Sequence, residues 1–216
     1  MMLETRFGGR SPRNILCLGA HCDDIEIGCG GTMLKMSREI PGMNVRWIVF
    51  SSDGEREREA RDSAADFLEG VGEKAVSILD FRNGYFPQCW GQIKDYFEGL
   101  KEEFVPDVIF THCRGDLHQD HRVLHELTWN TFRDHLILEY EIAKYDADLR
   151  SPNAFVRLDE ELCGKKVGYL LKHFRSQADK PWFTEDLFRS LMRLRGVESN
   201  SPGMYAEGYY CRKIIL

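Results

Sequence analysis

Short apolar runs recur along the chain, and longer segments with apolar residues on one side separate them. Each run is only a few residues long and is bounded by glycine, proline or polar residues, which is typical of buried parallel strands. The predicted strands are residues 15–18, 45–50, 75–79 and 108–111, and residues 205–216 form a further strand-like segment.

The segments between these runs carry apolar residues at helical spacing. Helices are predicted around residues 33–36 and over residues 55–68, 92–104, 121–138, 159–175 and 184–195. Strands that alternate with helices predict an α/β fold with a mostly parallel sheet. There is no internal repeat, and the polar residues 145–155 mark only a weak boundary, so we expect one domain over residues 1–216.

Composition and charge narrow the classes of protein that fit this pattern. The chain has 216 residues, 43% of them hydrophobic, which suffices for a substantial core. The net charge of −6 and the lack of a long basic tract argue against nucleic acid or an anionic membrane as a partner. No apolar segment has the length of a bilayer span, so stable membrane insertion is not expected. Seven scattered cysteines without a CxxC pair favour reduced thiols and a cytoplasmic location.

A histidine and two adjacent aspartates follow the first predicted strand. His21, Asp23 and Asp24 stand in the segment LGAHCDDIEIGCGGT, residues 18–32. In a doubly wound sheet, ligands bind beyond the carboxyl ends of the strands, so these side chains stand where a site would be built. Taken alone, Asp24 is more simply explained as an N-cap or first-turn acid of the next helix, and the acidic pair as a cap or a solvated loop.

The glycines of the same segment do not form a nucleotide-binding motif. The order Gly28-Cys29-Gly30-Gly31 lacks the GxGxxG spacing, and no GxxxxGK[ST] phosphate loop is present. We therefore interpret these glycines as positions where a helix packs closely on the sheet.

A second polar cluster follows the fourth predicted strand. The segment THCRGDLHQDHR, residues 111–122, contains Asp116, His118, Asp120 and His121. Both clusters fall at the same predicted edge of the sheet, which favours one composite metal site. Two histidines and a carboxylate are a common ligand set for catalytic zinc, and the remaining groups can serve as general acid and base.

The two clusters resemble the signatures of a known family. AHCDDIEIGCGGT resembles the AHPDDxExGxGGT signature of the LmbE/PIG-L-type zinc-dependent N-deacetylases, and DLHQDHR resembles their DxHxDH signature. Shorter matches lie at residues 56–60, 176–177 and 205–207. The resemblance implies a Rossmann-like three-layer fold. It also implies removal of the acetyl group from an N-acetylated amino sugar of the N-acetylglucosamine type, or from its conjugate, by metal-bound water that attacks the amide carbonyl.

The resemblance also implies which residues bind the metal. His21, Asp24 and His121 match the family's zinc ligands, and another divalent transition metal is the alternative to Zn²⁺. Cys22 stands where the family has a proline, so the loop is expected to be less rigid. A minor alternative is that Cys22 competes as a soft ligand.

Roles in catalysis and substrate binding follow from the same motif positions. Asp23 matches the general base, and His118 matches the residue that stabilises the oxyanion and protonates the leaving amine. Asp120 is expected to hold and tune His118. Arg56 matches a contact to sugar hydroxyls, and Asn83 stands near a position where relatives carry a substrate-binding aspartate.

Two other classes of function remain open at this point. One is a metal-dependent amidase or phosphoesterase that acts on a non-sugar substrate, and the other is a binding protein that keeps the fold without catalysis. The resemblance implies a small-molecule amino-sugar substrate and self-association into a homo-oligomer. The sequence does not determine which N-acetyl sugar is used.

Overall fold

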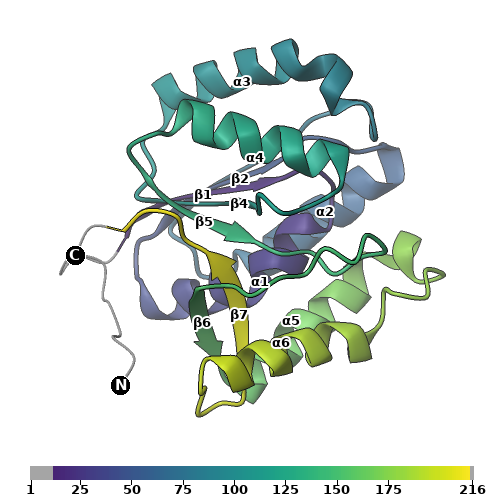
Figure 1. Cartoon of the computed structure of the whole chain (residues 1–216). Helices are drawn as coiled ribbons and strands as arrows, with labels where there is room; N and C mark the ends of the chain where they lie inside the picture. The colour runs from purple at the N-terminus through teal and green to yellow at the C-terminus, as the bar shows by residue number, and fades with distance from the viewer. Residues whose placement is uncertain (1–11, 215–216) are drawn as a thin grey trace.

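The computed structural model describes residues 12–214, which form a sheet of seven strands with helices on both faces (Figure 1). The strand order is β3-β2-β1-β4-β5-β7-β6. Strands β1 to β5 are parallel, and β7 pairs antiparallel with both β5 and β6. The strands are β1 (Asn14–Gly19), β2 (Asn44–Val49), β3 (Glu73–Ile78), β4 (Val108–His112), β5 (Leu136–Tyr140), β6 (Ala154–Leu158) and β7 (Tyr205–Tyr210).

Helices form a layer on each face of the sheet (Figure 1). One layer contains α3 (Trp90–Glu103) and α4 (Gln119–Thr131). The other contains α1 (Asp24–Glu39), α2 (Gly54–Phe67), α5 (Glu160–His173) and α6 (Glu185–Glu198). Two 3₁₀ turns, η2 (Phe86–Cys89) and η3 (Arg175–Gln177), complete the described elements. The predicted three-layer α/β fold with a mostly parallel sheet is confirmed.

The core is divided between the two faces of the sheet. Along β1, Ile15 and Cys17 pack in one buried cluster, and Leu16 and Leu18 pack in the other. A strand that is buried on both faces has no polar side to present, which explains why the predicted strands are continuous apolar runs.

The fourth helix ends earlier than the sequence predicted. Residues 121–138 were predicted as one helix, but α4 ends at Thr131 and β5 begins at Leu136. Phe132 leaves the helical conformation with φ −105° and ψ 61°. The apolar run Leu136-Ile137-Leu138 fits a helix face and a buried strand equally well. These residues form strand β5 because pairing with β4 satisfies their backbone hydrogen-bonding groups.

Other boundaries also differ from the prediction. The first helix begins at Asp24, well before the predicted residues 33–36, and β6 (Ala154–Leu158) was not predicted. The strand predicted over residues 205–216 ends at Tyr210, and residues 215–216 lie outside the described residues. No helix among residues 12–214 has the length and apolar character needed to cross a bilayer.

The glycines of α1 allow close packing, as predicted. A Cβ on Gly28 would lie 2.2 Å from Cδ2 of Tyr140 in β5. A Cβ on Gly31 would lie 2.5 Å from Cδ1 of Leu158 in β6. The start of α1 is thereby held against the sheet, directly after the carboxyl end of β1.

Strand β1 lies between β2 and β4, so the chain order reverses at this point of the sheet. Such a topological switch leaves a crevice outside the carboxyl ends of the two strands, where open α/β sheets bind their ligands. Both polar clusters found in the sequence follow strands that end at this crevice.

Candidate active site

Three predicted ligand residues converge in the crevice from separate segments. His21 lies in the loop after β1, Asp24 in the first turn of α1, and His121 in the first turn of α4. His21 Nδ1 lies 3.1 Å from His121 Nε2, and Asp24 Oδ2 lies 3.2 Å from His21 Nδ1 and 3.4 Å from His121 Nε2. Ligand atoms on a zinc tetrahedron are separated by about 3.3 Å, so the three atoms fit such a site.

A carboxylate lies against the far side of each histidine ring, so the other ring nitrogen faces the ligand cluster. His21 Nε2 lies 3.2 Å from Asp120 Oδ2, and His121 Nδ1 lies 2.8 Å from Asp116 Oδ2. A carboxylate accepts a hydrogen bond from an N–H group, so a neutral ring at either position carries its lone pair on the nitrogen that faces the ligand cluster. Carboxylates in this position are typical partners of metal-bound histidines.

The charges of the cluster also suit a cation. Burial raises the pKa of Asp24, but the imidazoles of His121, His112 and His21 outweigh it and hold this pKa well below its usual range. Burial lowers the pKa of His21, but Asp24 and Asp120 raise it to about 10. Burial and His112 lower the pKa of His121 to about 3. The cluster therefore favours one positive charge among its facing nitrogens, and a divalent cation would supply positive charge at this point.

The two aspartates do not cap α1. Asp23 is the N-cap residue, but its side chain makes no capping hydrogen bond. Asp24 Oδ2 instead accepts the backbone N–H of His21 at 2.7 Å. Asp24 does lie in the first turn of α1, as the alternative predicted, but neither carboxylate caps the helix, and both contact other groups of the site.

Arg56 of α2 pairs with the predicted base. Its Nη2 donates to Asp23 Oδ1 at 2.9 Å, and both side chains are largely buried. Burial raises the pKa of Asp23, and Arg56 opposes this rise. The resemblance predicted that Arg56 contacts sugar hydroxyls, and that contact stays a prediction. Among the described residues, the Arg56 guanidinium contacts the carboxylate of Asp23.

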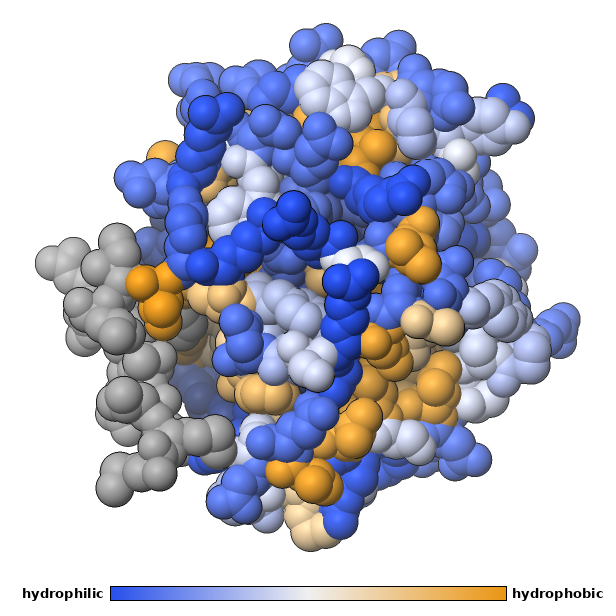
Figure 2. Space-filling model, viewed as in Figure 1, coloured by the Kyte–Doolittle hydropathy of each residue, from blue (hydrophilic) through white to orange (hydrophobic). Residues whose placement is uncertain are grey.

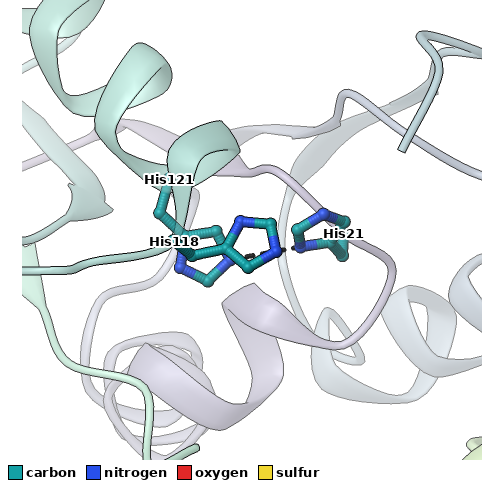
Figure 3. A group of neighbouring side chains, drawn as sticks. All are labelled: His21, His118 and His121. Carbon is teal, nitrogen blue, oxygen red and sulfur yellow. Dashed lines mark hydrogen bonds between the residues drawn. The ribbon is translucent and has the colours of Figure 1, made fainter. Parts of the chain in front are cut away.

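His118 lies beside the ligand cluster (Figure 3). Its ring centre is 4.9 Å from that of His21 and 4.6 Å from that of His121. Its Nδ1 accepts the backbone N–H of Asp120 at 3.2 Å, so a neutral ring carries its proton on Nε2. Burial and His21 lower the pKa of His118, which favours this neutral form.

Asp120 occupies a different position from the one that the sequence predicted. Its carboxylate accepts from His21 and from the backbone N–H groups of Gly84 and Phe86, at 2.6 and 3.1 Å. Only its backbone N–H reaches His118. Asp120 therefore positions the predicted ligand His21 through its side chain and His118 through its backbone.

Asn83 is exposed in the turn that precedes Gly84. Because the Gly84 N–H is bonded to Asp120, this turn is fixed at the rim of the site. No described contact joins Asn83 to the ligand cluster, and its predicted part in substrate binding stays a prediction.

Cys22 does not contribute a ligand atom in this arrangement. The residue is fully buried, and its Sγ lies 3.5 Å from the backbone oxygen of Ser51. Burial raises the pKa of the Cys22 thiol to about 12, which disfavours the thiolate that a soft metal site requires.

A lysine from outside both motifs supports the ligand cluster. Lys144, in the loop after β5, has its Nζ 3.1 Å from Asp116 Oδ2 and 2.6 Å from Asp148 Oδ2. Asp148 in turn accepts the backbone N–H of Leu117 at 2.8 Å. The loop after β5 thereby holds the segment that carries Asp116 and His118. Sequence reasoning missed Lys144 because no spacing connects it to either motif.

His112, the last residue of β4, was also missed. Its ring stacks on that of His121 with centres 3.8 Å apart, and its Nε2 lies 3.4 Å from Asp24 Oδ2. The same nitrogen accepts the backbone N–H of Ala20 at 3.0 Å, which occupies its lone pair. Asp24, His112 and His121 form a second group that could hold a metal ion, but the Ala20 N–H already occupies the His112 nitrogen that faces Asp24. A histidine at the end of a buried strand, within the segment 111–122 that carries the second cluster, was the available signal.

Residues 16–132, more than half of the chain, match the family described as PIG-L, GlcNAc-PI de-N-acetylase. The match runs from β1 past the end of α4 and includes both polar clusters. A curated relative, the uncharacterized deacetylase YaiS of Escherichia coli K12, is 27% identical over 177 residues, covering 74% of this chain and 90% of that protein.

Two solved structures are similar in fold. One is N,N'-diacetylchitobiose deacetylase from Pyrococcus horikoshii, with a TM-score of 0.68, 21% identity and coverage of 93% of this chain and 84% of that chain. The other is GalB, the 4-carboxy-2-hydroxymuconate hydratase from Pseudomonas putida KT2440, with a TM-score of 0.70, 15% identity and coverage of 94% and 98%. A deacetylase and a hydratase share this fold, so the fold alone does not select the reaction.

Proposed function

The chain belongs to the PIG-L family of GlcNAc-PI de-N-acetylases, and we propose that it is a zinc-dependent hydrolase that removes the acetyl group from an N-acetylated amino sugar or sugar conjugate. The observation that carries the proposal is the convergence of His21 Nδ1, Asp24 Oδ2 and His121 Nε2 within 3.1–3.4 Å of one another. A carboxylate suited to proton transfer, Asp23, stands next to this set.

When bound, a divalent cation polarises a carbonyl oxygen and makes a coordinated water more acidic. His21, Asp24 and His121 would hold it, with Asp120 and Asp116 orienting the two rings. Among the divalent metals, zinc suits this mixed imidazole and carboxylate set.

Asp23 is proposed to take the proton from the attacking water. Its buried carboxyl has a raised pKa, which suits a base that must accept a proton near neutral pH. Arg56 holds one oxygen of Asp23 and leaves the other for the water. After a new C–O bond forms and the amide C–N bond breaks, the same carboxyl can return its proton to the nitrogen. The products are acetate and a free amine.

His118 is proposed to stabilise the oxyanion that forms when water attacks. Its Nδ1 is occupied by the Asp120 N–H, so Nε2 carries the hydrogen that can be donated to the substrate. A donor fixed in this way before the reaction stabilises the negative charge without further reorganisation.

The test is to incubate the zinc-loaded protein with a panel of N-acetyl amino sugars and their conjugates. Free amine and acetate should appear in equal amounts. A parallel panel of non-sugar amides and phosphoesters tests the alternative hydrolase. Turnover of only that second panel would contradict the sugar assignment, and a protein that binds zinc but turns over neither panel would contradict the catalytic one.

Three broader assignments belong to the same proposal. We treat residues 1–216 as one catalytic domain, supported by the single seven-stranded sheet of the described residues. A cytoplasmic location is supported by seven cysteines that form no disulfide. Self-association is carried over from the resemblance and is testable by light scattering.

A further inference from the structure

A groove of about 650 Å³ lies along the outer side of α4, away from the ligand cluster. Its lining includes five cationic side chains, Arg114, Arg122, Arg133, Arg212 and Lys213. The lining residues include one carboxylate, that of Glu126. This local excess of positive charge stands on a chain whose net charge is −6. Figure 2 shows strongly hydrophilic side chains gathered in front of α4 and beside the C-terminal segment.

The fold assembles this groove from segments far apart in the sequence. Arg114 lies in the loop after β4, Arg122 and Arg133 belong to α4 and the turn after it, and Arg212 and Lys213 follow β7. This explains why the sequence shows no basic tract. At 1.5 Å per helical residue, α4 rises about 14 Å from Arg122 to its last residue, Thr131, and Arg133 follows two residues later.

A buried carboxylate organises the wall of the groove. Glu139 of β5 is 1% exposed and accepts from Arg212 Nε at 2.7 Å and from Trp129 Nε1 at 2.8 Å. It also accepts the backbone N–H of Arg114 at 2.8 Å. The Arg212 guanidinium lies over the Trp129 ring, 4.4 Å from its centre. These contacts fix two of the cationic segments relative to α4 before any ligand binds.

Two of the cations have no internal partner. Arg114 and Arg122 are exposed, and within residues 12–214 neither guanidinium has an ion pair or hydrogen bond. Both side chains line the groove, where cationic lining residues outnumber the one lining carboxylate, and such an excess of positive charge attracts an anion. Their planar donor forks match the oxygen geometry of a phosphate group.

We propose that this groove binds the phosphate groups of a phosphorylated ligand. A single phosphate would engage only part of the lining, because the cations lie along a helix segment of about 14 Å and the turn after it. The groove therefore fits a diphosphate, or a phosphate ester that carries a second anionic group.

The groove is distinct from the candidate active site. His121 and Arg122 are neighbours on α4, yet His121 is 2% exposed among the ligand cluster and Arg122 is exposed on the outer side. The inference therefore stands apart from the proposed function, and it can be tested without a substrate.

The test uses the full chain after treatment with a chelator, so that no metal can bind the probe. Pyrophosphate binding is measured by calorimetry at low salt, and sedimentation measures binding to phosphatidylcholine vesicles with and without phosphatidic acid. The test variant is Arg114→Ala/Arg122→Ala, chosen because neither side chain supports the fold. The control is Arg58→Ala/Arg193→Ala, which removes the same charge from α2 and α6 on the other face of the sheet.

The groove variant should bind the probe about tenfold more weakly than the wild type, because each lost contact is a charge-assisted hydrogen bond. The control variant should bind the probe like the wild type. Binding should also weaken as salt rises. If the groove variant loses pyrophosphate binding, the result supports a soluble phosphorylated ligand. If it loses only the binding to phosphatidic acid vesicles, the result supports a lipid headgroup as the ligand. Equal binding by wild type and groove variant, or no binding of either probe, overturns the proposal.

Discussion

Asp23 and Asp24 are neighbours in the chain, yet their surroundings shift the two carboxyl pKa values in opposite directions. Asp24 faces three imidazoles, which hold its pKa well below the usual range despite burial. Asp23 is buried with Arg56 as its nearest counter-charge, and its pKa is raised. Groups whose pKa values are driven apart in this way commonly divide the roles of a site between them. Here the low-pKa carboxylate suits a cation and the high-pKa carboxyl suits proton transfer.

The change Asp23→Asn tests this division at the residue scale. The amide keeps the shape of the side chain but cannot accept the proton, so acetate release should fall by about 10²–10⁴-fold while zinc content stays near one equivalent. Metal analysis and an acetate assay on the same sample measure both. Asp24→Asn is the matched control and should lose zinc. Undiminished turnover in Asp23→Asn would show that this carboxyl is not the base.

Lys144→Met tests whether the loop after β5 supports the metal ligands. Removing the ammonium group that lies 3.1 Å from Asp116 Oδ2 loosens the carboxylate that orients His121. Zinc affinity should fall by about 10–100-fold in competition with a chromogenic chelator. Lys101→Met, at an exposed position of α3, is the control and should keep wild-type affinity. Lys144→Arg should recover part of the loss, and an unchanged affinity in Lys144→Met would refute the supporting role.

At the scale of the element, α1 is shaped by what packs against it. Two backbone groups in the middle of α1 contact side chains of other elements. The Ile27 carbonyl accepts from Lys166 Nζ at 2.6 Å, and the Gly31 N–H donates to Glu207 Oε1 at 2.8 Å. Lys166 and Glu207 pair with each other at 2.6 Å and are both nearly fully buried. This pair ties α5 and β7 to the middle of α1, and so fixes the helix whose first turn carries Asp24.

Gly28→Ala tests the contact between α1 and the sheet. The new methyl group would lie 2.2 Å from Tyr140 Cδ2, so the helix or the ring must move, and the free energy of unfolding should fall by about 1–3 kcal/mol. Gly99→Ala in α3 is the control, since its Cβ would meet nothing within 4 Å. That substitution should raise stability by about 0.5–1 kcal/mol through the better helix propensity of alanine. Urea unfolding measures both, and equal effects would contradict the packing argument.

At the scale of the whole molecule, one buried acid links stability to pH. Glu26 of α1 is fully buried, and Ser63 of α2 partly offsets the effect of this burial on its carboxyl group. Burial raises the pKa of Glu26 well above its usual value. The folded state therefore holds a proton that the unfolded chain releases near its ordinary pKa of about 4.3.

Glu26→Gln should therefore change how stability depends on pH. With the folded pKa raised, the stabilisation from this group is complete below about pH 4.3 and is lost as the pH rises through the folded value. The slope from this one proton is about 1.4 kcal/mol per pH unit. Denaturant unfolding of the metal-free protein between pH 5 and pH 8 should show a smaller loss of stability in Glu26→Gln than in the wild type. Parallel curves for the two proteins would contradict the assignment.

The sequence by itself determined the α/β class, most strands and the two polar clusters, because hydrophobic periodicity and motif spacing are local properties of the chain. Its errors are where local pattern is ambiguous: residues 136–138 fit a helix or a strand, and only pairing with β4 made them β5. Tertiary structure alone brought Lys144 to Asp116, turned the Asp120 carboxylate to His21, and gathered five cations beside α4. These contacts join residues distant in sequence through backbone geometry and burial, which no local spacing records.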